Sequence, residues 1–207
     1  MAINTEKSKI MIFNYTKNHQ FTTRLSINNV NLEVVNQAKL LGTHITNDLK
    51  WDVNTRQIIR KSNARMQLLQ KIVSFGATIE DALHIYKIYV RSALEFSSSV
   101  WHTSLTKENE EDLERIQKSA FRVILGNEYT LDILQMETLK ERRQILFQNF
   151  RQKSLKLVQM GNIIKEKNKE HIMNTRNKET FEVTRTNTER SERCTGIRMQ
   201  KFLNEFY

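Results

Sequence analysis

Five basic side chains occupy a stretch of the chain that contains no acidic residue, bounded by Asp52 and Glu80. The five residues are Arg56, Arg60, Lys61, Arg65 and Lys71. Cations without neighbouring carboxylates can bind an anion, and the net charge of +10 on 207 residues indicates a polyanion, nucleic acid before a membrane surface. A solvated basic surface without a partner is the alternative interpretation.

The residue types that catalysis needs do not form a recognisable active site. Two-metal nucleotidyl transfer requires carboxylates close together, but the sequence has no Asp-Asp pair. Glu80-Asp81 and Glu111-Asp112 fall at predicted helix starts, where the helix dipole favours acids. The histidines show no i, i+4 pairing, the single Cys194 has no nearby histidine, and the glycines are isolated. We therefore predict no catalytic residue, no metal site and no cofactor in this chain.

The basic stretch is predicted to lie on a helix that begins near Asp52 and ends at Phe75-Gly76. At 100° per residue, Arg56, Arg60 and Lys71 lie within roughly 60° of one another. Apolar residues lie on the far side of this helix. They are Ile58, Ile59, Met66, Leu69 and Val73.

Three further helices follow from capping signals and apolar periodicity. Thr78-Ile-Glu-Asp81 resembles a capping box, Thr106 precedes a cluster of acids, and a fourth helix is predicted over residues 131–160. Their apolar stripes are Ile79, Leu83, Tyr86, Val90 and Leu94; Leu113, Ile116, Ala120, Phe121 and Ile124; and Leu134, Leu139, Leu146, Phe147, Phe150 and Leu157. We expect Trp51 and Trp101 to join Tyr86 and Phe121 in the core.

Short strands are predicted near the N-terminus, at residues 9–13, 24–27, 32–35 and 39–45, with Asn28-Asn29 as a turn. The predicted class is therefore α+β, with a small N-terminal antiparallel β-hairpin lobe followed by a predominantly α-helical bundle and a basic tail. The corresponding segments are 1–50, 51–160 and 161–207. The net charge is +3 over residues 1–50, +1 over residues 51–150 and +6 over residues 151–207.

Cysteine content and hydropathy exclude two classes of protein. One cysteine cannot build a disulfide framework, and no run approaches 18 apolar residues. We expect a soluble intracellular chain, in the nucleus or the cytoplasm, with no disulfide partner and no membrane partner.

Three stretches carry a resemblance to a known family. Residues 4–13 are similar to an Asn-x-x-Lys-Thr-x-x-Met-x-Phe strand, residues 39–51 to a Lys-x-Leu-Gly hairpin with a later Leu-x-Trp, and residues 83–126 to a downstream helical segment. In this order they resemble the C-terminal part of reverse transcriptases, the RNA-directed DNA polymerases of non-LTR retrotransposons. Residues 139–143 and 199–204 extend the likeness. The family's Asp-Asp palm motif has no counterpart here, so the chain looks like a fragment.

The resemblance implies roles for six residues in holding an RNA–DNA template–primer. Lys7 matches a lysine thought to aid proton delivery, Leu41 and Gly42 match the primer grip, and a thumb-type helix would carry phosphate-binding cations. The implied nucleic-acid-binding residues are Lys7, Leu41, Gly42, Arg56, Arg60 and Lys71. Mg²⁺ is expected only for the intact polymerase. Alone, the chain should be catalytically inactive and bind nucleic-acid duplexes weakly, without sequence preference.

Two alternatives to the reverse transcriptase fragment stay open. One is a non-enzymatic basic helical protein that binds RNA or an acidic protein partner. The other is a decayed reading frame without selected function. For the chain in general, the exposed strand edges of the N-terminal hairpin predict self-association.

Overall fold

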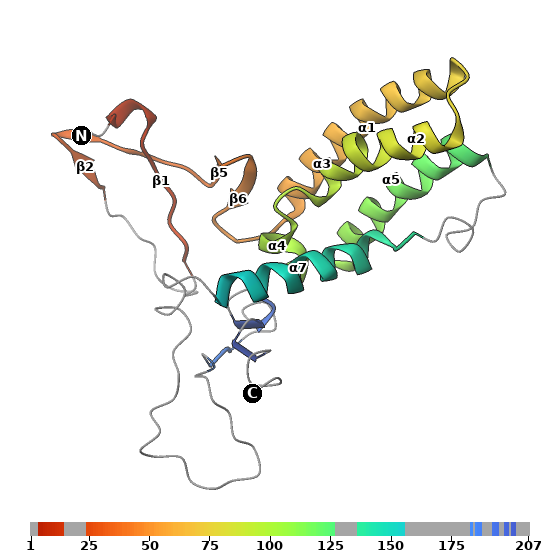
Figure 1. Cartoon of the computed structure of the whole chain (residues 1–207). Coiled ribbons are helices and arrows are strands. Elements are labelled where there is room, and N and C mark those ends of the chain that lie inside the picture. Colours follow the sequence, from red (N-terminus) through yellow and green to blue (C-terminus); the bar gives the residue numbers. More distant parts are fainter. Residues whose placement is uncertain are drawn as a thin grey trace, which may run out of the picture. The chain divides into compact units, whose positions relative to one another are not determined.

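The computed structural model describes residues 4–14, 24–126 and 136–155, and short pieces at 183, 185–187, 192–194, 197–198 and 200–201. The chain divides into two compact units, Met1–Lys61 and Ser62–Tyr207, with the boundary inside the first long helix. Short strand pairs precede a mostly helical region (Figure 1), which confirms the predicted α+β class. The predicted basic tail lies largely outside the described residues.

The strands of the N-terminal unit form three separate pairs. Strands β1 (Lys9–Ile10) and β4 (Glu33–Val34) are parallel, whereas β2 (Ser26–Ile27) with β3 (Val30–Asn31) and β5 (Gln37–Leu40) with β6 (Thr43–Thr46) are antiparallel. The predicted strand 9–13 is therefore too long. The purely antiparallel expectation misses the β1–β4 pair, in which Lys9 Nζ lies 2.8 Å from Glu33 Oε2.

The turns at residues 28–29 and 41–42 each contain two consecutive residues in the left-handed backbone conformation. Asn28 and Asn29 have φ of 52° and 62°, which confirms the predicted turn. Leu41 and Gly42 have φ of 47° and 91°. Two consecutive positive φ values are typical of a type I′ hairpin turn. The prediction of one strand over residues 39–45 is therefore wrong, because these residues form the two strands of a hairpin and the turn between them.

Helix α1 (Asp52–Ser74) confirms the first helical prediction and buries the predicted side. Ile58, Met66 and Leu69 are buried, because residues three and four positions apart recur on one face. The chain then leaves the helix at Gly76, whose φ of 85° is easily reached only without a side chain.

The second predicted helix consists of three parts: α2 (Ile79–Ile85), the π-helix η2 (Tyr86–Arg91) and α3 (Ser92–Glu95). The predicted Thr78 cap is present, since its Oγ1 accepts a hydrogen bond from the Asp81 N–H at 3.2 Å. Tyr86, Val90 and Leu94 are fully buried. Ile79 is exposed, contrary to the predicted stripe, because it opens the helix beside the turn.

The remaining helices are α4 (Ser98–Trp101), the 3₁₀ turn η3 (His102–Ser104), α5 (Lys107–Leu125) and α7 (Leu139–Leu155). The apolar stripe predicted for the third helix is buried throughout α5, and Thr106 caps it through the Asn109 N–H.

Helix α7 begins later than residue 131, since residues 136–138 are not helical. Its start is a capping box that sequence reasoning missed: the Thr138 N–H donates to Glu141 Oε2 at 2.9 Å, and the Glu141 N–H donates to Thr138 Oγ1 at 3.2 Å. Two predicted core positions, Leu134 and Leu157, lie outside the described residues.

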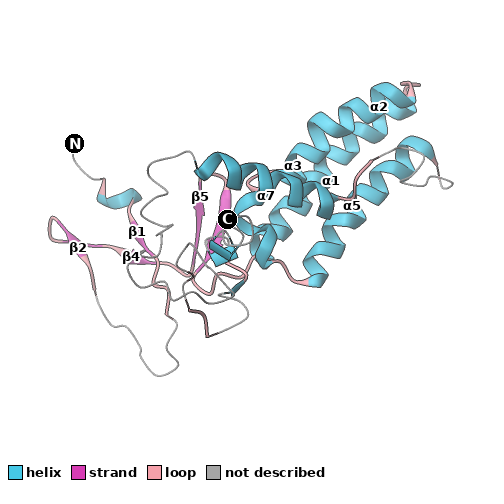
Figure 2. Ribbon diagram, turned by 60° about the horizontal axis from the view of Figure 1, so that its bottom comes forward, coloured by secondary structure: helices cyan, strands magenta, loops and turns pink. Residues whose placement is uncertain are grey.

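The core of the helical unit forms where α7 packs across α3, α4 and α5 (Figures 1 and 2). The rings of Tyr86 and Phe121 meet edge to face at 5.1 Å, and the Tyr86 hydroxyl donates to Gln117 Oε1 at 2.6 Å. Trp101 is also fully buried. Trp51, in the N-terminal unit, is buried with 9% of its surface exposed. The prediction that these aromatics are core residues is confirmed.

Candidate nucleic-acid interface

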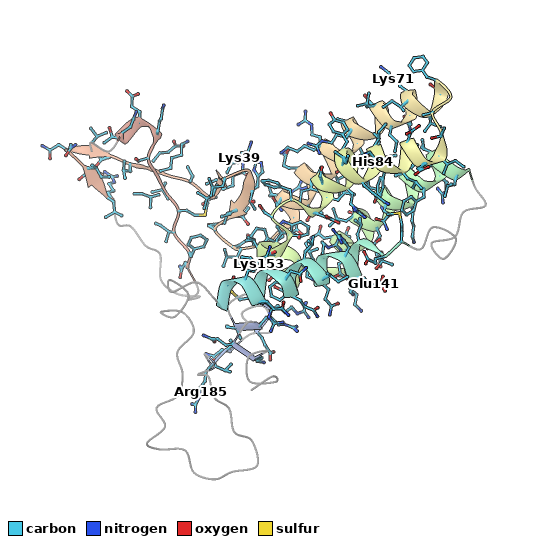
Figure 3. The ribbon with its side chains drawn as sticks, viewed as in Figure 1. Lys39, Lys71, His84, Glu141, Lys153 and Arg185 are labelled. Carbon is cyan, nitrogen blue, oxygen red and sulfur yellow. The ribbon has the colours of Figure 1, made fainter. Side chains whose placement is uncertain are left out.

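The exposed side of α1 carries the basic residues proposed to meet a polyanion. Arg56, Arg60 and Lys71 are all exposed, and Lys71 lies near the end of the helix that leads to α2 (Figure 3). With a rise of 1.5 Å per residue, the three positions extend over about 22 Å of helix. They form one stripe because steps of four and eleven residues return to nearly the same side of a helix. We call these three residues the α1 stripe.

Among the described residues, carboxylates do not neutralise the α1 stripe. Within the part of the chain that the structure describes, Arg60, Lys61 and Lys71 form no ion pair. Arg56 directs its Nε–H to the Asp52 carbonyl at 3.4 Å. The electrostatic field of this side of α1 is therefore available to an anion, at the strength that surrounding salt permits.

Arg65 belongs to the same acid-free stretch but has a different role. Its Nη1 donates to the Tyr89 carbonyl at 2.5 Å and to Ser92 Oγ at 3.2 Å, and its Cζ lies 4.7 Å from the centre of the Tyr89 ring. Arg65 thus ties α1 to η2 and α3. Sequence reasoning gave no sign of this, because the partner is 24 positions away and its carbonyl belongs to a π-helix.

The other proposed residues lie in the N-terminal unit. Lys7 is the exposed last residue of the 3₁₀ turn η1 (Thr5–Lys7), and its N–H donates to Asn4 Oδ1 at 3.2 Å. Leu41 and Gly42 form the β5–β6 turn. No hydrogen bond or ion pair of the described residues joins Lys7 to this turn or to the α1 stripe.

Leu41 is an unusual residue for its position. Its φ of 47° is one that bulky residues rarely adopt, at a cost of roughly 1–2 kcal/mol. Its side chain is 91% exposed, so burial does not offset the cost. An exposed, strained leucine at a hairpin tip is available for contact with a partner.

A cluster of Trp101, His102 and Arg143 lies in the helical unit, where α4, η3 and α7 meet. Arg143 is wholly buried, with its Cζ 5.8 Å from the centre of the Trp101 ring. None of its three guanidinium nitrogens has a hydrogen-bond partner among the described residues. Burial lowers the pKa of Arg143, whereas the charges of Glu114, Glu110 and Glu95 act in the opposite direction.

His102 in this cluster is expected to make the stability of the protein sensitive to acid. Burial, followed by the positive charge of Arg143, lowers the pKa of His102 from 6.5 to about 4. The unfolded chain binds this proton more readily, so stability is fully present above pH 6.5 and decreases as the pH falls toward 4. In denaturant unfolding, His102→Gln should therefore lose less stability than the wild type between pH 7 and pH 4.5.

The control for this experiment is His84→Gln, which alters an exposed histidine of α2 (Figure 3). It should keep the pH dependence of the wild type. Identical pH dependence in His102→Gln and the wild type would contradict a neutral, partly buried His102.

Metal and membrane sites were also sought in the described ranges. No three His, Cys, Asp or Glu side chains gather there as a metal site, and Cys194 is an exposed thiol. None of the described helices has the length and apolar character needed to cross a membrane. No family model, curated protein or solved structure matches the chain.

Proposed function

We propose that this chain is the template–primer-holding part of a non-LTR retrotransposon reverse transcriptase, with α1 as its thumb-type helix. The observation that carries the proposal is the α1 stripe: three exposed cations on one side of a helix, in a stretch of 27 residues (53–79) that contains no acid. The order of the three motifs that resemble the family supports the same assignment.

The chemistry proposed for the stripe is contact with phosphates. Lys and Arg contacts to the backbone position a duplex without reading its sequence, and each contact releases condensed counterions. An RNA–DNA hybrid would therefore bind weakly, without sequence preference and with strong dependence on salt. Because the sequence has no Asp-Asp pair, polymerisation is not proposed for this chain alone.

The hairpin turn has a proposed role in the same function. Leu41 and Gly42 would support the primer terminus, since an exposed leucine beside a glycine offers an apolar contact and close access to backbone. Lys7 would lie near the reacting phosphates only in the intact polymerase, where Mg²⁺ is expected.

Charge reversal of the α1 stripe tests the proposal. The triple variant Arg56→Glu/Arg60→Glu/Lys71→Glu should bind a blunt RNA–DNA hybrid at least about tenfold more weakly at low salt. The slope of log K against log salt should fall by up to about 3, one unit for each lost phosphate contact. Fluorescence anisotropy at several salt concentrations measures both quantities.

A matched variant distinguishes the effect of losing the α1 stripe from the effect of lowering the net charge of the protein. Lys87→Glu/Lys118→Glu/Arg122→Glu changes three exposed cations of η2 and α5, with the same change in total charge. It should weaken binding much less. Equal losses in the two variants would contradict the α1 stripe as the binding face, and Mg²⁺-dependent primer extension by this chain alone would contradict the inactive-fragment part of the proposal.

A further inference from the structure

Large apolar side chains lie exposed where α1 ends and α2 begins. Phe75, in the turn, is 86% exposed, Ile79 is 55% exposed and Leu68 is 43% exposed. These residues belong to one compact unit. Single exposed apolar residues are ordinary on protein surfaces. A phenylalanine with almost its whole ring in water, accompanied by two aliphatic side chains, points to a contact.

The apolar residues share the surface of α1 with its cations. At 100° per residue from Arg56, Lys71 lies at roughly 60°, Phe75 at about 100° and Leu68 at about 120°. Lys71 and Phe75 are one helical turn apart, and the Phe75 N–H donates to the Lys71 carbonyl at 3.0 Å. The exposed ring therefore adjoins the C-terminal end of the α1 stripe.

The turn is also sterically open. A Cβ placed on Gly76 would meet no atom within 4 Å, so the backbone beside Phe75 has space around it. The Phe75 side chain itself is 86% exposed, so a flat group can reach the ring from solvent.

The positive charge beside the Phe75 ring indicates which class of ligand the site would bind. A partner must combine negative charge with flat apolar faces, because the site combines cations with an aromatic ring. An unpaired stretch of nucleic acid has both: phosphates for the cations, and bases whose faces stack on aromatic side chains. In a blunt duplex the bases are already stacked, so only the cations would be used.

We propose that the α1–α2 end binds single-stranded nucleic acid, with Lys71 on a phosphate and the Phe75 ring stacked on a neighbouring base. The inference rests on the proposed function, since it uses the same basic face, and adds an unpaired strand to the duplex as its ligand. Phe75 supplies the preference for unpaired bases, and the α1 stripe supplies charge that acts on every nucleic acid.

The test compares three probes of about twelve nucleotides, within the usual size of such sites. They are oligothymidylate, a strand of the same length made of abasic sugar phosphates, and a blunt RNA–DNA hybrid. Phe75→Ala in the full chain should bind oligothymidylate about tenfold more weakly, the effect of one lost stacking contact. It should bind the abasic strand and the hybrid as the wild type does. Phe75→Trp should retain binding, and oligothymidylate should quench the fluorescence that this variant gains over the wild type.

Phe150→Ala is the matched control, because Phe150 is an exposed phenylalanine on α7. It should leave all three affinities unchanged. If charge reversal of the α1 stripe weakens binding while Phe75→Ala changes nothing, the proposed function stands and base stacking is overturned. Base stacking is also overturned if Phe75→Ala loses equal affinity for oligothymidylate and for the abasic strand. Vesicles of phosphatidylcholine and phosphatidylserine serve as an additional probe. If Phe75→Ala weakens binding to these vesicles alone, base stacking is overturned and the partner is a membrane.

Discussion

Replacement of Trp101 by alanine is expected to lower the free energy of unfolding by about 3–5 kcal/mol, the usual effect of removing a buried aromatic side chain. Trp101 has no exposed surface, and its Nε1–H donates to the Phe96 carbonyl at 3.1 Å. The substitution removes the ring from the contact between α4 and α7 and leaves a cavity. It also leaves the Phe96 carbonyl without its donor, a further cost.

Urea unfolding at fixed pH measures this effect. Trp101→Phe should be intermediate, because it keeps part of the ring but loses the hydrogen bond. Val100→Ala is the control on the same short helix: its side chain is about half exposed and should change stability by less than 1 kcal/mol. A Trp101→Ala variant within 1 kcal/mol of the wild type would contradict a core built around this residue.

Sequence reasoning succeeded where local chemistry decides structure. Trp101 was expected in the core, and the periodic stripe through Leu113 and Phe121 predicts the buried face of α5. Caps worked for the same reason, since Thr78 and Thr106 each bond an N–H three residues later. Both signals lie within one or two helical turns and therefore survive in a single sequence.

The missed features depend on distant contacts. The β1–β4 pair joins strands 24 positions apart, and nothing local to Lys9 specifies a parallel partner. The π-helix η2 interrupts a continuous apolar stripe that periodicity interprets as one α-helix, because Tyr86 and Val90 remain buried despite the change of winding. Two-residue strands are likewise too short for alternation to define.

The candidate interface shows the same division. Arg56, Arg60 and Lys71 were predicted opposite the apolar side of a helix, and that geometry follows from helical periodicity alone. Helical periodicity already leaves Arg65 outside this group, but its contact with Tyr89 could not be predicted, since Tyr89 is brought near only by the folding of α1 beside η2. Phe75 was interpreted only as part of a helix stop, because exposure of a side chain is a property of the tertiary structure.

Substitution of Arg143 by methionine is expected to raise the free energy of unfolding by up to about 4 kcal/mol, the upper end of the effect seen when well-packed apolar residues replace buried ion pairs. A charged guanidinium loses its hydration on folding, and hydrogen bonds normally compensate for this loss. Arg143 is fully buried, yet its nitrogens have no such partner among the described residues. Methionine retains an unbranched apolar chain against Trp101. It removes a buried charge that the carboxylates of Glu114, Glu110 and Glu95 stabilise only in part.

The adjacent Arg142 provides the matched control for Arg143→Met. Its Nε lies 3.1 Å from Glu95 Oε1, and it is about one-third exposed, so Arg142→Met removes a compensated charge and should lower stability by up to about 1 kcal/mol. Opposite signs in neighbouring residues are hard to obtain from helix propensity, because both replacements are the same. Were Arg143→Met to destabilise the protein by as much as Arg142→Met or more, the guanidinium would have to be satisfied in solution, through water or through Glu114, Glu110 and Glu95. Arg143→Met should also raise the pKa of His102 from about 4, since the positive charge of Arg143 is one of the causes that lower it, after burial.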